Sequence, residues 1–194
     1  MKKLTGLNKY KTAVFISGTG SNLKNLIKFS IKKKSPISIN LVVSSNKHAK
    51  GLKYADNKKI HKVVFNFLKQ KKTEKKILNI LFKKEIKLIC LAGFMKILSK
   101  NFIKKFNGKI LNIHPSLLPK YKGLNTHERA LINNEKFSGC TVHYVSNQLD
   151  SGKIILQKKI KIKKNESIFT LKNKILKEEH KLYPKAIKKV LSNL

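Results

Sequence analysis

Short apolar runs alternate with segments of helical periodicity up to residue 113, and this alternation restricts the fold more than any other feature of the chain. The first run ends in Gly18-Thr19-Gly20, and from Asn22 the apolar residues recur at helical spacing. Because the runs are apolar on both faces, they are typical of parallel strands that helices cover. The expected strands span residues 12–17, 37–43, 62–65, 88–92 and 110–113, and the expected helices include residues 22–31, 50–57 and 77–82. We therefore predict an α/β protein with an open, mostly parallel sheet that helices cover.

A different pattern begins after Pro115, where a proline-punctuated loop runs through Pro119 and the sheet is expected to become mixed. The further expected elements are a helix at residues 126–132, strands at residues 141–145 and 154–162, and a closing helix from residue 167. Ser167 or Asn165 is the candidate N-cap of this last helix. Because 194 residues suit one compact domain and no repeat or low-complexity linker interrupts them, we expect a single domain over residues 1–194.

The formal net charge of +36 is the most extreme bulk property, and by itself it suggests a nucleic-acid or other anionic partner. Of the 45 basic residues, however, only Arg129 is an arginine, whereas proteins that read bases and phosphates use the planar arginine fork. The lysines are also scattered, and the abundance of lysine, asparagine and isoleucine beside scarce alanine is typical of genome-wide codon bias. We expect no nucleic-acid partner, although such a surface would attract a polyanionic substrate.

No segment indicates a membrane, a secretion route or a metal. The apolar runs fall short of the roughly 18 residues that cross a bilayer, and Met1 to Tyr10 carries lysines with no long apolar run behind them. Cys90 and Cys140 lack the paired spacing of a zinc cluster or a disulfide framework. We expect an unprocessed, soluble, cytoplasmic protein with no membrane partner and no metal.

The loop Ser17-Gly18-Thr19-Gly20-Ser21-Asn22 joins the first expected strand to its helix. Its glycines let the backbone approach an anion, and the N–H groups and dipole of the helix start favour negative charge, so the loop fits a phosphate. A dinucleotide site is poorly supported, because Leu23 replaces the third glycine of the fingerprint and Ser44-Ser45-Asn46 lacks the acidic residue for a ribose. The alternative is a tight turn without a ligand.

Asn112-Ile113-His114 ends the fifth expected strand, at the edge of a parallel sheet where ligands bind. Asn112 and His114 point to the same side of an extended chain, so an amide and an imidazole can converge on one reacting atom, as an acyl transfer with a developing oxyanion requires. Asp150, one of only two aspartates, can raise the pKa of His114 and keep it protonated, or help to carry off a proton. The alternatives are a capping asparagine, a structural histidine and a turn aspartate.

Four motifs follow one another along nearly the whole chain. They are residues 16–23 (ISGTGSNL), 91–98 (LAGFMKIL), 111–121 with NIHPSLLP at 112–119, and 149–152 (LDSG). Together they resemble the phosphoribosylglycinamide formyltransferase family, the folate-dependent enzymes of early purine synthesis. Several long motifs in the right order are far more specific than any one of them.

The resemblance implies the formyltransferase fold, a Rossmann-like, open, mostly parallel twisted sheet with helices on both faces. It also implies a phosphate-binding half at about residues 10–110 and a folate and catalytic half at about residues 88–194. It also implies an enzyme that transfers the formyl group of 10-formyltetrahydrofolate to the amine of glycinamide ribonucleotide. The products are formylglycinamide ribonucleotide and tetrahydrofolate, in de novo purine biosynthesis, and neither a metal nor a covalent enzyme intermediate is required.

The implied site residues fall into three groups. Asn112 and His114 would stabilise the oxyanion that forms when the amine attacks the formyl carbon, and Asp150 would tune His114 and relay a proton through water. The implied binding residues are Gly20, Ser21, Asn22 and Glu179 for glycinamide ribonucleotide, and Met95, Lys96, Ile97, Leu98 and Asn112 for the formyl-folate, in a pocket between the two halves of the sheet.

The chain departs from the family pattern at three places. Gln70-Lys71-Lys72 stands where the family commonly has a folate-facing arginine, and Asn125 stands in place of the usual histidine, although His127 follows two residues later. Asparagine can still hydrogen-bond a phosphate but carries no charge. Thr19 replaces a commoner asparagine, a change from which we expect little effect.

Two other functions compete with this interpretation. A catalytic domain like that of methionyl-tRNA formyltransferase shares the Asn, His and Asp chemistry, and the basic charge would favour it. That family carries an additional carboxyl-terminal tRNA domain, whereas this chain is expected to end with its closing helix. A noncatalytic nucleic-acid-binding module would need lysines focused on one face and aromatic platforms for bases. We expect small-molecule substrates and a monomer or weak homodimer.

Overall fold

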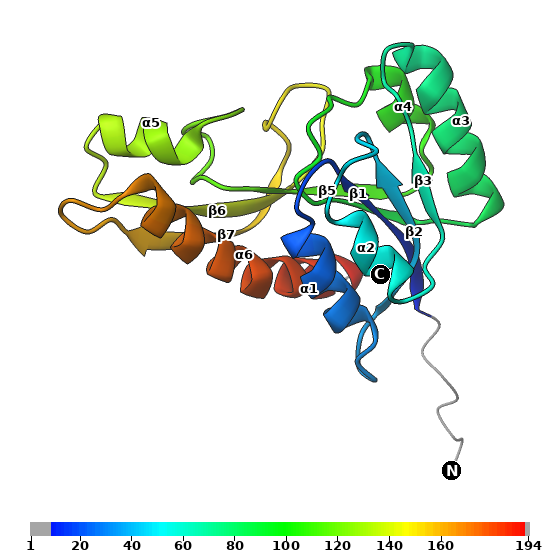
Figure 1. Cartoon of the computed structure of the whole chain (residues 1–194), viewed down its shortest axis with the longest axis horizontal. Helices are drawn as coiled ribbons and strands as arrows, with labels where there is room; N and C mark the ends of the chain where they lie inside the picture. The colour runs from blue at the N-terminus through cyan, green and yellow to red at the C-terminus, as the bar shows by residue number, and fades with distance from the viewer. Residues whose placement is uncertain (1–8, 193–194) are drawn as a thin grey trace. The chain divides into compact units, whose positions relative to one another are not determined.

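The computed structural model describes residues 9–192 (Figure 1). Residues 1–8, from which we expect an unprocessed start, and residues 193–194 lie outside the described range. The strands are β1 (Tyr10–Ile16), β2 (Ile37–Ser44), β3 (Lys62–Val64), β4 (Leu88–Leu91), β5 (Lys109–His114), β6 (Phe137–Tyr144) and β7 (Ile154–Lys161). The helices are α1 (Ser21–Ser30), α2 (Leu52–Asp56), α3 (Gln70–Lys83), α4 (Lys100–Lys105), α5 (Thr126–Ile132) and α6 (Ile168–Leu191).

The strands form one seven-stranded sheet in the order β3-β2-β1-β4-β5-β6-β7. β1 pairs in parallel with β2 and β4, and β2 pairs in parallel with β3. β6 instead pairs antiparallel with both β5 and β7. The predictions of an open, mostly parallel α/β sheet, and of a change to mixed pairing after residue 115, are confirmed.

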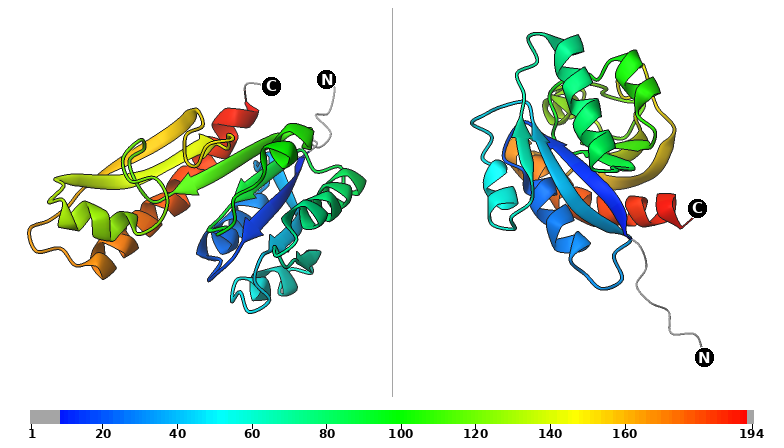
Figure 2. Two further views of the ribbon diagram at one scale, coloured as in Figure 1. Left: turned by 90° about the horizontal axis from the view of Figure 1, so that it is seen from above. Right: turned by 90° about the vertical axis from the view of Figure 1, so that its right-hand side faces the viewer.

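The chain divides into two compact units, and the first of them contains β1 to β4 with α1 to α3. From β1 the strand order moves outward to β3 and then returns to β4 on the other side of β1. Because such crossovers are right-handed, α1 and α2 cover one face of these strands and α3 covers the other (Figure 2). The carboxyl ends of β1 and β4 lie next to each other where the strand order reverses, which is the position at which open α/β sheets bind ligands.

The second unit contains the antiparallel strands and α6, which runs along β6 and β7 (Figure 1). Apolar residues of α6, among them Leu171, Ile175 and Ile187, are fully buried. The hydroxyl of Tyr183 donates a 3.0 Å hydrogen bond to the carbonyl of Leu111, which ties α6 to β5. The helix is capped by Ser167, one of the two predicted candidates, whose hydroxyl accepts from the Thr170 N–H.

Three elements differ from the sequence-based expectation. α4 was not predicted, because Phe102 is its only buried residue and a helix of six residues shows no apolar period. β6 begins at Phe137, earlier than expected, since its polar start is held by pairing with β7. α3 extends back to Gln70 through lysines that carry no apolar signal. Within residues 9–192 no helix is both long and apolar enough to cross a membrane.

Candidate active site

The loop after β1 requires glycine at position 20. Gly20 has a φ of +73°, and a Cβ there would lie 2.5 Å from the Cα of Gly51. The Lys24 N–H donates to the Gly20 carbonyl, so the helix α1 starts directly at this turn. Because Gly20 is the N-cap, no cap side chain occupies the first N–H groups of α1. The predicted phosphate loop therefore lies at a helix start, and its binding of a phosphate stays a prediction.

Ser17 joins the loops that follow β1, β2 and β4. Its hydroxyl lies 2.6 Å from the hydroxyl of Ser45 and accepts the N–H of Met95 at 2.8 Å, while its own N–H donates to the Gly93 carbonyl at 3.0 Å. The predicted phosphate loop and the start of the predicted folate segment are thus held at one edge of the first unit.

The four residues predicted to line the folate pocket differ in exposure. Met95 and Ile97 are 60% and 65% exposed, and Lys96 is exposed as well. Leu98 is only 5% exposed, because its side chain belongs to the core. Met95 and Ile97 therefore offer apolar side-chain surface to a ligand, whereas the side chain of Leu98 does not; the role of all four residues in a folate pocket stays a prediction.

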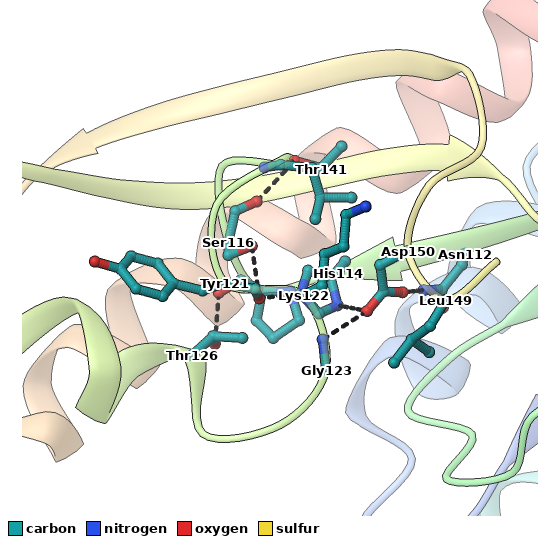
Figure 3. A network of polar contacts seen from close by, with 12 residues as sticks. Asn112, His114, Ser116, Tyr121, Lys122, Gly123, Thr126, Thr141, Leu149 and Asp150 are labelled. Atoms are coloured by element: carbon teal, nitrogen blue, oxygen red, sulfur yellow. Dashed lines mark hydrogen bonds and ion pairs between the residues drawn. The ribbon is translucent and has the colours of Figure 1, made fainter.

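Asn112, His114 and Asp150 come together in the second unit (Figure 3). Asp150 Oδ2 lies 3.3 Å from His114 Nδ1, and Asp150 Oδ1 accepts from Asn112 Nδ2 at 3.3 Å. The side chains of His114 and Asp150 are 6% and 7% exposed. Asp150 has a φ of +47°, a conformation that aspartate adopts more readily than most residues. The carboxylate of Asp150 is therefore the common partner of the Asn112 amide and the His114 imidazole. The fold thus brings Asp150 close to two residues that lie 38 and 36 positions before it in the sequence.

His143 is a fourth member of this cluster that the sequence does not reveal. It lies opposite Asn112 in the antiparallel register of β5 and β6, it is 2% exposed, and its Nε2 lies 3.2 Å from Asn112 Nδ2 and 3.6 Å from Asp150 Oδ1. Its Nδ1 lies 2.8 Å from the carbonyl of Tyr144, which can only accept, so Nδ1 carries a proton and donates to that carbonyl. A single histidine in an apolar strand is only a weak indication of a functional site. The pairing of His143 with Asn112 becomes evident only from the register of β5 and β6.

The pKa values of the cluster reflect a balance between burial and charge. Burial lowers the pKa of His114 and outweighs the Tyr121 carbonyl and Asp150, both of which raise it. Asp150 therefore acts in the expected direction, while burial opposes it. Burial acts to raise the pKa of Asp150, yet donation from His143 and the Gly123 N–H, together with the charges of the two histidines, brings its pKa below the usual value. At neutral pH Asp150 is therefore an ionised carboxylate beside the His114 imidazole.

The loop between β5 and α5 encloses the cluster. Its Tyr121 carbonyl lies 2.9 Å from His114 Nε2, and its Gly123 N–H donates to Asp150 Oδ2 at 2.9 Å. Asn125 has a φ of +56°, a conformation that asparagine tolerates better than most residues. Burial, with the charges of Lys172 and His114, lowers the pKa of His127.

The remaining predicted residues lie on other elements. Glu179 is 7% exposed on α6, close enough to Cys140 for its charge to raise the pKa of that thiol, after the larger effect of burial. Gln70, Lys71 and Lys72 form the first turn of α3. In the described part of the chain, no three His, Cys, Asp or Glu side chains are grouped so that they could hold a metal ion. The roles of Glu179, and the absence of a metal, stay predictions.

Known proteins resemble this chain along almost its full length. The family described as formyl transferase matches residues 10–187. The phosphoribosylglycinamide formyltransferase of Haemophilus influenzae is 41% identical over 181 residues, which are 92% of this chain and 85% of the relative. The human trifunctional purine biosynthetic protein adenosine-3 is 42% identical over 187 residues, or 95% of this chain.

This chain spans only 18% of the length of that human protein. Among solved structures, the phosphoribosylglycinamide formyltransferase of Brucella melitensis superposes with a TM-score of 0.89 at 40% identity, covering 94% of this chain and 96% of that one. The glycinamide ribonucleotide transformylase 1 of Symbiobacterium toebii superposes with a TM-score of 0.90 at 31% identity, covering 96% and 90% of the two chains.

Proposed function

This chain is a member of the formyl transferase family, and we propose that it transfers the formyl group of 10-formyltetrahydrofolate to the amine of glycinamide ribonucleotide in purine biosynthesis. Relatives that carry the name phosphoribosylglycinamide formyltransferase, and that this chain nearly covers, support this substrate over initiator tRNA. We place the reaction in the cytoplasm and the active species as a monomer or weak homodimer.

The observation that carries the proposal is the shared carboxylate of Asp150. It lies within 3.3 Å of both Asn112 and His114, which places an amide, an imidazole and an ionised acid around one small volume. Acyl transfer to an amine needs groups that take up a proton and groups that stabilise negative charge on oxygen. Burial raises the pKa of Cys140 to about 12, so this thiol cannot act as a nucleophile at neutral pH. Direct attack by the substrate amine fits these residues.

The resting charges define how the residues act. As the amine nitrogen bonds to the formyl carbon, Asn112 donates one N–H to the formyl oxygen, because the negative charge that develops there makes it a strong acceptor. The proton released by the amine is taken up by the Asp150 and His114 pair, and His114 then becomes a cation beside that charge. The same proton passes to the departing folate nitrogen when the old carbon–nitrogen bond breaks.

The folate co-substrate, when bound, supplies the formyl carbonyl that the amine attacks. The exposed apolar side chains of Met95 and Ile97 fit a ligand with a flat heteroaromatic ring, because such a ring would remove their apolar surface from water. We propose that they contact the folate ring, with Lys96 beside them and Asn112 at the formyl group. The loop Gly20-Ser21-Asn22 would hold the substrate phosphate through its N–H groups, and Glu179 would hold the glycinamide amine.

Ser21→Asp tests the phosphate loop. A carboxylate at the first residue of α1 repels the phosphate, so the KM for glycinamide ribonucleotide should rise by roughly 10- to 100-fold while the KM for the folate changes little. The protein should fold normally, because acidic residues stabilise helix N-termini. Gly20 is unsuited to this test, since any side chain there meets the Gly51 backbone. Ser21→Asn is the uncharged control, and an equal rise in both KM values would argue against the phosphate assignment.

Formyl acceptance tests the function itself. The purified chain should form tetrahydrofolate from 10-formyltetrahydrofolate when glycinamide ribonucleotide is added, and not when charged initiator methionyl-tRNA is added. Formylation of the tRNA with a comparable kcat/KM would favour the tRNA alternative. Transfer to neither acceptor, by a chain that is folded by circular dichroism, would reject both enzymatic assignments.

A further inference from the structure

One loop holds both acid–base groups of the cluster. The Tyr121 carbonyl faces His114, and two residues later the Gly123 N–H donates to Asp150. The distance between the imidazole and the carboxylate therefore depends on the conformation of residues 121–123. Tyr121 has a φ of +57°, which costs free energy for a residue with a large side chain, so other contacts must stabilise this conformation.

Arg129, on α5, binds the peptide group that serves Asp150. Its Nη1 donates to the carbonyl of Lys122 at 2.7 Å and lies 3.4 Å from the carbonyl of Leu124. The Lys122 carbonyl and the Gly123 N–H belong to the same peptide group. A hydrogen bond to the carbonyl polarises this group and strengthens its N–H as a donor. The guanidinium is thus connected to Asp150 Oδ2 through a single peptide unit.

Arg129 also stabilises Tyr121. Its guanidinium carbon lies 5.0 Å from the centre of the Tyr121 ring, and the Tyr121 hydroxyl donates to Glu135 Oε1 at 2.7 Å. The phenol ring points away from His114 and Asp150, while the Tyr121 backbone lies beside His114 (Figure 3). The ring is therefore held from outside the cluster, and the carbonyl that His114 faces is held with it.

The residue type at position 129 is the second observation. Arg129 is the one arginine among 45 basic residues, in a chain that otherwise uses lysine throughout. A lysine is a flexible point charge, whereas a guanidinium is planar, stacks on an aromatic ring and donates in fixed directions. The contacts of Arg129 with the Tyr121 ring and with two carbonyls need these properties. The one arginine of the chain thus stands at a position where a lysine could not make the same contacts.

We propose that Arg129 is a positioning residue for the Asp150 and His114 pair, acting through the Lys122–Gly123 peptide group and the Tyr121 ring. The proposal rests on the proposed function, because the pair is assigned to formyl transfer. Arg129 contacts neither acid–base group directly; its role is to keep their two backbone partners in place.

Arg129→Lys keeps the charge but removes the planar fork. It should lower kcat for formyl transfer roughly tenfold, less than the roughly 100-fold that 1 Å of misplacement can cost, while both KM values stay within about twofold. Independently of turnover, the Gly123 amide proton should move upfield in the NMR spectrum, because its hydrogen bond to Asp150 weakens. Selective glycine labelling makes this signal accessible, as the chain has nine glycines. Arg129→Ala should give the same changes.

Lys161→Gln is the matched control, since it removes one positive charge from an exposed position of β7 and should leave kcat and the Gly123 signal unchanged. An unchanged kcat in Arg129→Lys overturns the proposal whether or not the Gly123 signal moves, and so does a rise in KM alone. If the wild-type chain transfers no formyl group, the proposed function fails. The Gly123 signal then decides separately whether Arg129 holds this peptide, and an unmoved signal overturns that contact as well.

Discussion

Asp150→Asn should lower kcat by roughly 10²–10⁴, the range for loss of a general acid–base group, with much smaller changes in either KM. The substitution keeps the shape and the oxygen that accepts the Gly123 N–H. It removes the negative charge and places an amide NH2 at the Oδ1 position, where the Nδ2 donor of Asn112 lies 3.3 Å away. The proton released by the amine then has no charged acceptor.

The pH–rate profile of Asp150→Asn gives a second expected result. Asp150 raises the pKa of His114 against the larger opposing effect of burial. Without this charge the pKa of His114 falls further, so the inflection that reports His114, and with it the pH optimum of the remaining activity, should move to lower pH. Asp56→Asn is the matched control, because it is the same change at the other aspartate, which is exposed and paired with Lys62. A near-normal rate with an unshifted profile would reduce Asp150 to a turn residue.

Asn112→Ala should lower kcat by roughly 10²–10³, the cost of removing one oxyanion donor, and the KM for the folate should change far less. The loss appears in kcat because the charge on the formyl oxygen develops only in the transition state. Stability should change little, since Asn112 is partly exposed in β5. Steady-state kinetics with both substrates measures the division between kcat and KM.

Asn112→Asp separates the donor from the shape. It is nearly isosteric with asparagine, but it offers only acceptors and adds a second negative charge beside Asp150. It should therefore be at least as impaired as Asn112→Ala. Asn57→Ala, at an exposed position after α2, is the control and should behave like the wild type. Near-normal kcat in Asn112→Asp would show that no N–H from this residue reaches the formyl oxygen.

The sequence by itself determined the architecture of the first unit and the location of the loop and strand-end residues. Strands such as residues 88–91 are buried on both faces, and this burial leaves a continuous apolar run that can be read without coordinates. Glycines at a strand-to-helix turn, and polar residues at a strand end, mark the edge where ligands bind. The motifs at residues 16–23 and 112–119 also indicated the family that the comparisons confirm.

Only the tertiary structure decided the partners and charges of the cluster. The contact between Asn112 and His143 depends on the antiparallel register of β5 and β6, and no local pattern encodes a pairing between residues 31 positions apart. The protonation of His114 depends on how strongly burial opposes Asp150, which is a balance of desolvation and charge that composition does not contain. In the sequence, Arg129 is notable only as the single arginine. Its connection to Asp150 is visible only in the fold, where the Lys122–Gly123 peptide group hydrogen-bonds to both side chains.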